Sequence, residues 1–101
     1  MRSRPYMGAM ETKTSAEIIR RLTNALAPVT LKLDNDSAAH AGHMGDDGSG
    51  ETHWSLHIVS AQFDGLNRVQ RQRLVYKAIG DLMDNPIHAL AILAQTPAEA
   101  A

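Results

Sequence analysis

The distribution of apolar residues predicts a helix near the beginning of this chain. Thr14 and Glu17 have the spacing of a capping box, in which two side chains satisfy backbone N–H groups at a helix start. Apolar residues then recur at helical spacing: Ile18, Ile19, Leu22, Ala25 and Leu26. We expect this helix to end before Pro28, because proline cannot donate a backbone hydrogen bond.

Two later segments alternate between apolar and polar side chains, which is typical of half-buried strands. The first covers residues 29–33, and the second covers residues 52–60. Since successive strand side chains point to opposite faces, the second strand has two sets of side chains. The apolar set is Trp54, Leu56 and Ile58, and the polar set is His53, Ser55 and His57. Residues 35–51 contain four glycines and few apolar side chains, which predicts a long loop.

A second helical region is expected from a cap at Asn67 to about Met83. Its predicted buried stripe comprises Val69, Leu74, Val75, Ala78, Ile79, Leu82 and Met83. Gly80 allows either one continuous helix or two short helices at an angle. A third strand follows at residues 87–95, and the run Thr96-Pro97-Ala98-Glu99 has the pattern of a final helix start.

The resulting element order, αββααβ(α), predicts an α+β fold. A right-handed strand–helix–strand connection places the last strand parallel to the second. We therefore expect a three-stranded mixed sheet with helices packed on one face, formed by residues 13–101. Residues 1–12 are basic and lack the apolar core of a signal peptide, so we interpret them as a disordered leader.

Composition narrows the chemistry that this domain can perform. The 101 residues carry a net charge of −1 and no cysteine, but five histidines. The charge predicts no general affinity for nucleic acid or membranes, and the lack of cysteine excludes disulfides, thiol catalysis and a self-contained cysteine-ligated cluster. A site built by this chain therefore uses imidazole, carboxylate or a sulfur from a partner. The serines lack a nucleophile motif, and we expect no enzyme active site.

The histidines differ in what they can bind. His53 and His57 lie four residues apart on one strand, so roughly 13 Å separates their Cα atoms and one ion cannot bridge them. We interpret both as strand residues on the solvent face, with His53 able to hydrogen-bond the neighbouring strand or loop. His40 and His43 lie in the glycine-rich loop, where they are either metal ligands or incidental polar residues. His88 begins the third strand, and parallel pairing would bring it close to that loop.

A basic cluster forms the remaining candidate site. It comprises Arg68, Arg71, Arg73 and Lys77, in pairs that share a helix face. Such a cluster either contacts the phosphates of a nucleic acid or is a solvated helix face neutralised by nearby acids.

Several motifs of this chain resemble the BolA family over roughly residues 17–99. They are Asp36-Ser37-Ala38-Ala39-His40, Gly50-Glu51-Thr52-His53-Trp54, Val59-Ser60 with Phe63-Asp64-Gly65, Arg71-Gln72-Arg73-Leu74-Val75-Tyr76, Ile87-His88-Ala89-Leu90 and Thr96-Pro97. The family fold is αββααβα of the class II KH-like type. The sequence departs from the family where Gln72 replaces a frequent histidine between two arginines, and where His43 adds a second loop histidine.

The resemblance implies a non-catalytic adaptor in iron–sulfur trafficking and iron regulation. Members pair with a monothiol glutaredoxin and share a [2Fe–2S] cluster, for which the glutaredoxin supplies a cysteine and a bound glutathione. This chain would supply His88 and His40, with His43 in reserve, and would bind no cluster alone. A cluster with histidine in place of cysteine has a raised potential.

The family also leaves a second function open. Some members are described as DNA-binding regulators of stress genes, and the basic cluster would serve that role here. We expect a cytoplasmic bacterial protein, or a mitochondrial one if the source is eukaryotic. A weak homodimer of the free chain is left open.

Overall fold

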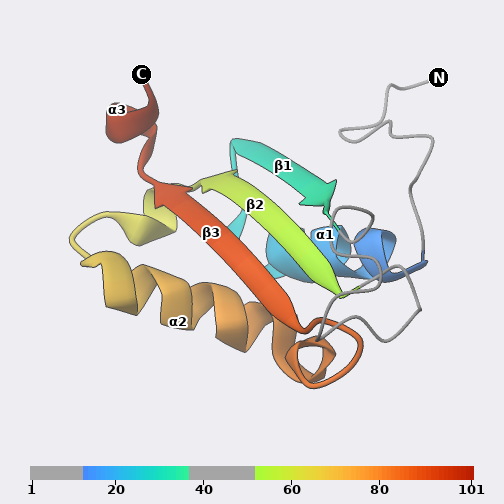
Figure 1. Cartoon of the computed structure of the whole chain (residues 1–101). Coiled ribbons are helices and arrows are strands. Elements are labelled where there is room, and N and C mark those ends of the chain that lie inside the picture. The colour runs from blue at the N-terminus through green and yellow to red at the C-terminus, as the bar shows by residue number, and fades with distance from the viewer. Residues whose placement is uncertain (1–12, 37–51) are drawn as a thin grey trace, which may run out of the picture.

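The computed structural model describes residues 13–36 and 52–101. Three helices and three strands make up this part of the chain, with two short 3-10 helices, η2 and η3, beside α2 (Figure 1). In chain order they are α1 (Lys13–Leu26), β1 (Thr30–Asn35), β2 (His53–Val59), η2 (Ala61–Phe63), α2 (Arg68–Ile79), η3 (Gly80–Met83), β3 (Ala89–Gln95) and α3 (Pro97–Ala100). The predicted leader, residues 1–12, lies outside the described residues. No helix in the described ranges is long and apolar enough to cross a membrane.

The sheet has the topology that the element order predicts. Its strand order is β1-β2-β3, with β1 antiparallel and β3 parallel to β2. The registers place Leu33 opposite Leu56 and His57 opposite Leu93. The predicted α+β fold with a three-stranded mixed sheet is therefore confirmed. Most strand ends differ from the predicted ones by one or two residues, and Val29 precedes β1 and is 70% exposed.

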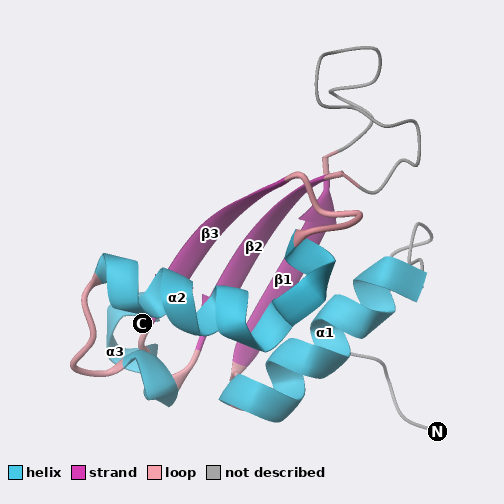
Figure 2. Cartoon of the chain, turned by 90° about the horizontal axis from the view of Figure 1, so that it is seen from below, coloured by secondary structure: helices cyan, strands magenta, loops and turns pink. Residues whose placement is uncertain are grey.

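The helices α1 and α2 cover one face of the sheet (Figure 2). The apolar side chains of β2 alternate in burial as predicted, and Trp54, Leu56 and Ile58 are each at most 3% exposed. The rest of the buried core comprises Ile18, Leu22, Leu26, Leu33, Phe63, Val75, Ile79 and Ile87. The opposite face carries the polar residues of β2, so its histidines lie away from the core.

Two details of the predicted helices are wrong. Thr14 lies inside α1 rather than before it, and the carboxylate of Glu17 contacts Arg20 and Arg21 in place of a capping role. These arginines lower the pKa of Glu17 from 4.5 to about 2, Arg20 more strongly than Arg21. Val69 is 54% exposed and does not belong to the buried stripe, because it lies in the first turn of α2.

The second helical region is divided into two helices, α2 and the 3-10 helix η3. The helix α2 begins at the predicted cap, where Asn67 and Gln70 form a reciprocal capping box. Its C-cap is Gly80, whose φ of 67° is a backbone conformation that residues other than glycine rarely adopt. A 3-10 helix follows. The guanidinium of Arg21 fixes this corner by donating to the Ile79 carbonyl and to the Asp81 carboxylate at 2.7 Å.

Candidate functional site

His88 lies at the rim of the sheet, immediately before β3. Its backbone N–H donates to the Thr52 carbonyl at 2.7 Å, and the N–H of Ala89 donates to the same carbonyl at 3.0 Å. The preceding residue, Ile87, is 2% exposed and packs in the core, whereas His88 is exposed. A buried anchor and two hydrogen bonds thus hold the backbone while the imidazole points away from the core.

The structure brings a second imidazole to the same rim. His53 is the first residue of β2, and its ring centroid lies 5.8 Å from that of His88, with the ring planes at 43°. Its Nδ1 is 2.8 Å from the Thr52 hydroxyl, so His53 makes a local hydrogen bond with the residue before β2. The alternating pattern of this strand indicated a structural role for His53 but not its proximity to His88. The signal was available, because the parallel strands β2 and β3 both start at this rim.

The predicted loop ligands, His40 and His43, lie outside the described residues, and their proximity to His88 stays a prediction. The described chain on either side of them ends at this rim. The backbone N–H of Asp36 donates to the His53 carbonyl at 2.8 Å, and the buried Thr52 precedes β2.

His57 occupies the other half of the same sheet face. Its Nε2 lies 2.8 Å from the Oε1 atom of Gln95, at the far end of β3 from His88. Four residues of strand separate it from His53, or roughly 13 Å between Cα atoms. Both histidines lie on β2, as the sequence predicts. In the described part of the chain, no group of three or more histidine, aspartate and glutamate side chains could hold a metal ion.

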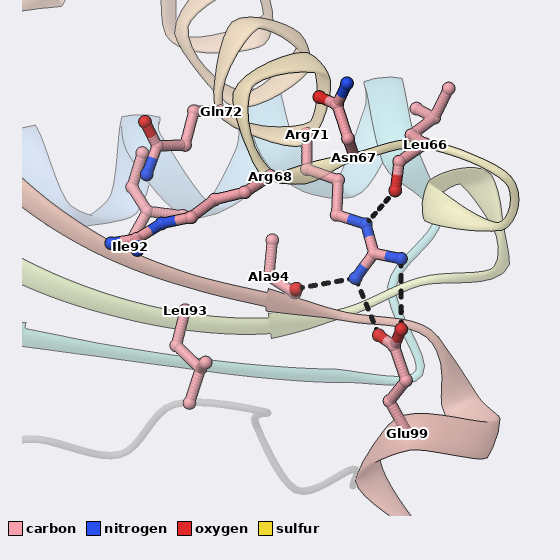
Figure 3. Close-up of a pocket in the computed structure, with 9 residues that line it drawn as sticks. All are labelled: Leu66, Asn67, Arg68, Arg71, Gln72, Ile92, Leu93, Ala94 and Glu99. Carbon is pink, nitrogen blue, oxygen red and sulfur yellow. Dashed lines mark hydrogen bonds and ion pairs between the residues drawn. The ribbon is translucent and has the colours of Figure 1, made fainter.

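The structure divides the basic cluster. Arg71 is only 15% exposed, and its Nε donates to the Leu66 carbonyl at 2.8 Å while Nη1 donates to the Ala94 carbonyl at 3.1 Å (Figure 3). The guanidinium also binds both carboxylate oxygens of Glu99, at 2.6 and 3.1 Å. This contact, followed by the backbone N–H of Thr96, lowers the pKa of Glu99 from 4.5 to about 2. Arg71 thus joins the start of α2 to β3 and α3.

The three other cations of the cluster, Arg68, Arg73 and Lys77, are exposed. Arg68 lines a groove of about 560 Å³ between the start of α2, the second half of β3 and α3. The sequence grouped Arg71 with these cations, either as a phosphate-contacting cluster or as a solvated helix face neutralised by nearby acids. Glu99, which the sequence already placed at a helix start, is the partner of Arg71. Their separation of 28 residues meant that no local pattern predicted this contact.

Comparison with known proteins identifies the family. The family model for BolA-like proteins matches residues 22–99. This chain belongs to the BolA-like family. It is 42% identical over 94 residues to the chloroplastic protein BOLA1 of Arabidopsis thaliana, covering 91% of this chain and 58% of that protein. It is 44% identical over 84 residues to human BolA-like protein 1, covering 83% of this chain and 58% of that protein. The chain thus spans less than two thirds of the length of these curated relatives.

Solved BolA structures share the fold. The BolA domain of SufE1 from Arabidopsis thaliana has a TM-score of 0.80 at 40% identity, covering 88% of this chain and 98% of that one. BolA1 from the same plant has a TM-score of 0.77 at 40% identity, covering 92% of this chain and 100% of that one. The α+β architecture of this BolA-like chain is therefore that of its family.

Proposed function

We propose that this BolA-like chain is a non-catalytic adaptor that shares a [2Fe–2S] cluster with a monothiol glutaredoxin. The main support is the placement of His88. Its imidazole is exposed, while the Thr52 carbonyl and the buried Ile87 fix its backbone. His88 is the proposed ligand from the strand, and His40 is the proposed ligand from the loop, with His43 in reserve. Cluster trafficking and iron regulation are the processes that such sharing would serve.

The side chains at the rim fit part of a cluster site and not a whole one. The chain has no cysteine to supply a thiolate. Among the described residues, His53 and His88 are adjacent imidazoles, but no third metal-ligating side chain joins them. The proposed ligands His88 and His40 would supply two imidazoles, and a glutaredoxin cysteine with bound glutathione would supply two thiolates. When bound, such a cluster with histidine ligands would carry a raised reduction potential.

His53 contributes a positioning role to this proposal. Its ring lies against one side of His88, and the contact of Nδ1 with the Thr52 hydroxyl restricts rotation of the His53 ring. A restricted neighbour reduces the orientations open to an otherwise exposed imidazole. His88 would thereby lose less conformational freedom on binding.

The experiment compares two histidine variants in one mixing assay. Cluster-loaded monothiol glutaredoxin with glutathione is mixed with the full chain, and visible absorption and circular dichroism are recorded. The unaltered chain should change the cluster spectrum on mixing, and His88→Ala should abolish this change. The matched control is His57→Ala, on the same sheet face but hydrogen-bonded to Gln95, which should behave as the unaltered chain. A His88→Ala spectrum identical to that of the unaltered chain would contradict the ligand assignment.

DNA binding receives weaker support from the geometry. Of the four cations assigned to it, Arg71 already binds Glu99 and two backbone carbonyls, which leaves Arg68, Arg73 and Lys77 for phosphates. The net charge of −1 adds no general attraction. We therefore propose the adaptor function and not DNA binding.

A further inference from the structure

Among the residues that the structure describes, the strand β3 has a neighbouring strand on one side only, because the sheet order is β1-β2-β3. In a parallel pair, alternate residues direct both backbone groups towards the neighbouring strand. The Ala89 N–H donates to the Thr52 carbonyl at 3.0 Å, and the Gln95 carbonyl accepts from the Ser60 N–H at 3.0 Å. These contacts at both ends show that the odd-numbered residues of β3 direct their backbone N–H and C=O groups towards β2.

The even-numbered residues of β3 therefore turn their backbone groups outward. They are Leu90, Ile92 and Ala94. The Ala94 carbonyl accepts a hydrogen bond from Arg71 Nη1, which confirms this direction and occupies one outward group. In residues 13–36 and 52–101, no other strand lies along this edge. Outward donors and acceptors on Leu90 and Ile92, with the Ala94 N–H, thus form a row suited to another strand.

The outer edge of β3 lacks the usual protection against strand pairing. Charged residues and proline commonly block exposed edges. The opposite edge strand, β1, carries Lys32 and Asp34, whereas β3 contains no charged residue and no proline. Leu93 in β3 is also 52% exposed. An unprotected edge of this kind is a template on which another strand can pair.

A groove adjoins this edge and supplies a cation. It has a volume of about 560 Å³, and its lining includes Arg68, Gln72 and Ile92, together with the ion pair of Arg71 and Glu99. Figure 3 shows the Arg68 side chain extending towards Ile92, while the guanidinium of Arg71 lies among its own partners at the other end. Arg68 is exposed and forms no ion pair with another described residue. Its guanidinium is therefore available to a ligand that enters the groove.

The charge of α2 decides what kind of strand fits. Every charged residue of this helix is basic, and Arg71 is paired with Glu99, which leaves Arg68, Arg73 and Lys77 as the cations available to a partner. A partner segment with carboxylates is favoured beside it. A second copy of this chain pairing through β3 would bring no carboxylate from that strand, and would bring the cations of two α2 helices to the same sheet. A nucleic acid would use the cations and leave the outward backbone groups of β3 without partners.

We infer that the outer edge of β3 and the adjoining groove form a docking site for an extended acidic segment of a partner protein. The segment adds to the sheet as a fourth strand along residues 90–94 and places a carboxylate against Arg68. Addition of a strand in this way gives affinity through main-chain hydrogen bonds, while the side chains give selectivity. Docking at this edge requires neither a cluster nor His88.

The test is a titration of the ¹⁵N-labelled full chain with a six-residue peptide of alternating valine and glutamate, without glutaredoxin or cluster. We expect the largest amide shifts at Leu90, Ile92 and Ala94, with slower hydrogen exchange there. Loss of a hydrogen bond to a charged group corresponds to about a tenfold change or more, so Arg68→Glu should weaken binding at least that much. The control, Lys32→Glu, reverses a cation on the other edge strand and should leave binding within about twofold, as expected for a distant surface charge.

Four results would overturn the docking site. They are amide shifts absent from residues 90–94, equal binding by a peptide with lysine in place of glutamate, equal binding by a peptide N-methylated throughout its backbone, and unchanged binding by Arg68→Glu. A DNA duplex that shifts residues 90–94 more strongly than the peptide would assign this surface to nucleic acid. Concentration-dependent dimerisation with protection of the same amides would assign it to a second copy. Because the assay contains no cluster, its failure is separate from failure of the adaptor function.

Discussion

Replacement of the buried residue next to the proposed ligand tests how the fold holds the rim. Ile87 is 2% exposed and packs in the core, and the exposed His88 follows it directly. Ile87→Ala removes three carbons, and burial of each contributes about 0.8 kcal/mol, which gives about 2.4 kcal/mol before any cavity is counted. With a cavity term, we expect a loss of about 3 kcal/mol, within the usual range for this substitution.

Urea unfolding measures this loss. A domain of this size has a total stability of about 5–15 kcal/mol, so the variant should remain folded in water. With a slope of about 1.5 kcal/mol per molar urea, the midpoint should fall by about 2 M. Hydrogen exchange of the His88 amide, which donates to the Thr52 carbonyl, should accelerate at the same time.

The matched control lies in the adjoining strand. Leu93→Ala also truncates an aliphatic residue, but Leu93 is 52% exposed, so the expected loss is below about 1 kcal/mol. Equal losses for Ile87→Ala and Leu93→Ala would refute the reasoning, because burial would then not decide the cost. A faster global unfolding with an unchanged His88 amide would refute the link between Ile87 and the rim.

Three further variants test other contacts. Ser60→Ala removes a buried hydroxyl that donates to the Leu26 carbonyl at 2.6 Å, and should cost about 1–3 kcal/mol in urea unfolding; a cost near zero would contradict that bond. Ala27→Gly should stabilise the chain slightly, by about 0.5–1 kcal/mol in thermal unfolding, because Ala27 has a φ of 45°, and a loss would show that the conformation is unstrained. Arg71 lowers the pKa of Glu99 from 4.5 to about 2. The ion pair therefore stabilises the fold fully above pH 4.5, and this stabilisation is lost as the pH falls towards 2. Glu99→Gln should be less stable at neutral pH and show a weaker acid dependence; an unchanged acid titration would argue against the pair.

The sequence was sufficient for the fold because its main signals are local. Alternation in residues 52–60 placed Trp54, Leu56 and Ile58 in the core, and Asn67 capped the second helical region as expected. The parallel pairing of β3 followed from the handedness of its connection. Val69 was misplaced because helical periodicity says nothing about how far the sheet extends beneath a first turn.

The site was less predictable because its decisive contacts are distant in sequence. Arg71 and Glu99 are 28 residues apart, and only the packed arrangement of α2, β3 and α3 brings them together. His53 and His88 meet because parallel strands start at the same rim, which follows from the predicted parallel pairing but not from the pattern of either strand alone. Side chains joined through tertiary packing require the structure, whereas those placed by alternation do not.

The most direct test of the adaptor function asks whether an imidazole of this chain binds iron. The full chain, with ¹⁵N only in its histidines, is combined with unlabelled glutaredoxin, glutathione and cluster, and the reduced complex is studied by pulsed electron paramagnetic resonance. The adaptor function predicts a strong coupling from a directly bound ¹⁵N nucleus that decreases or disappears in His88→Ala and persists in His57→Ala. A complex in which no ¹⁵N coupling of this size is present would contradict it.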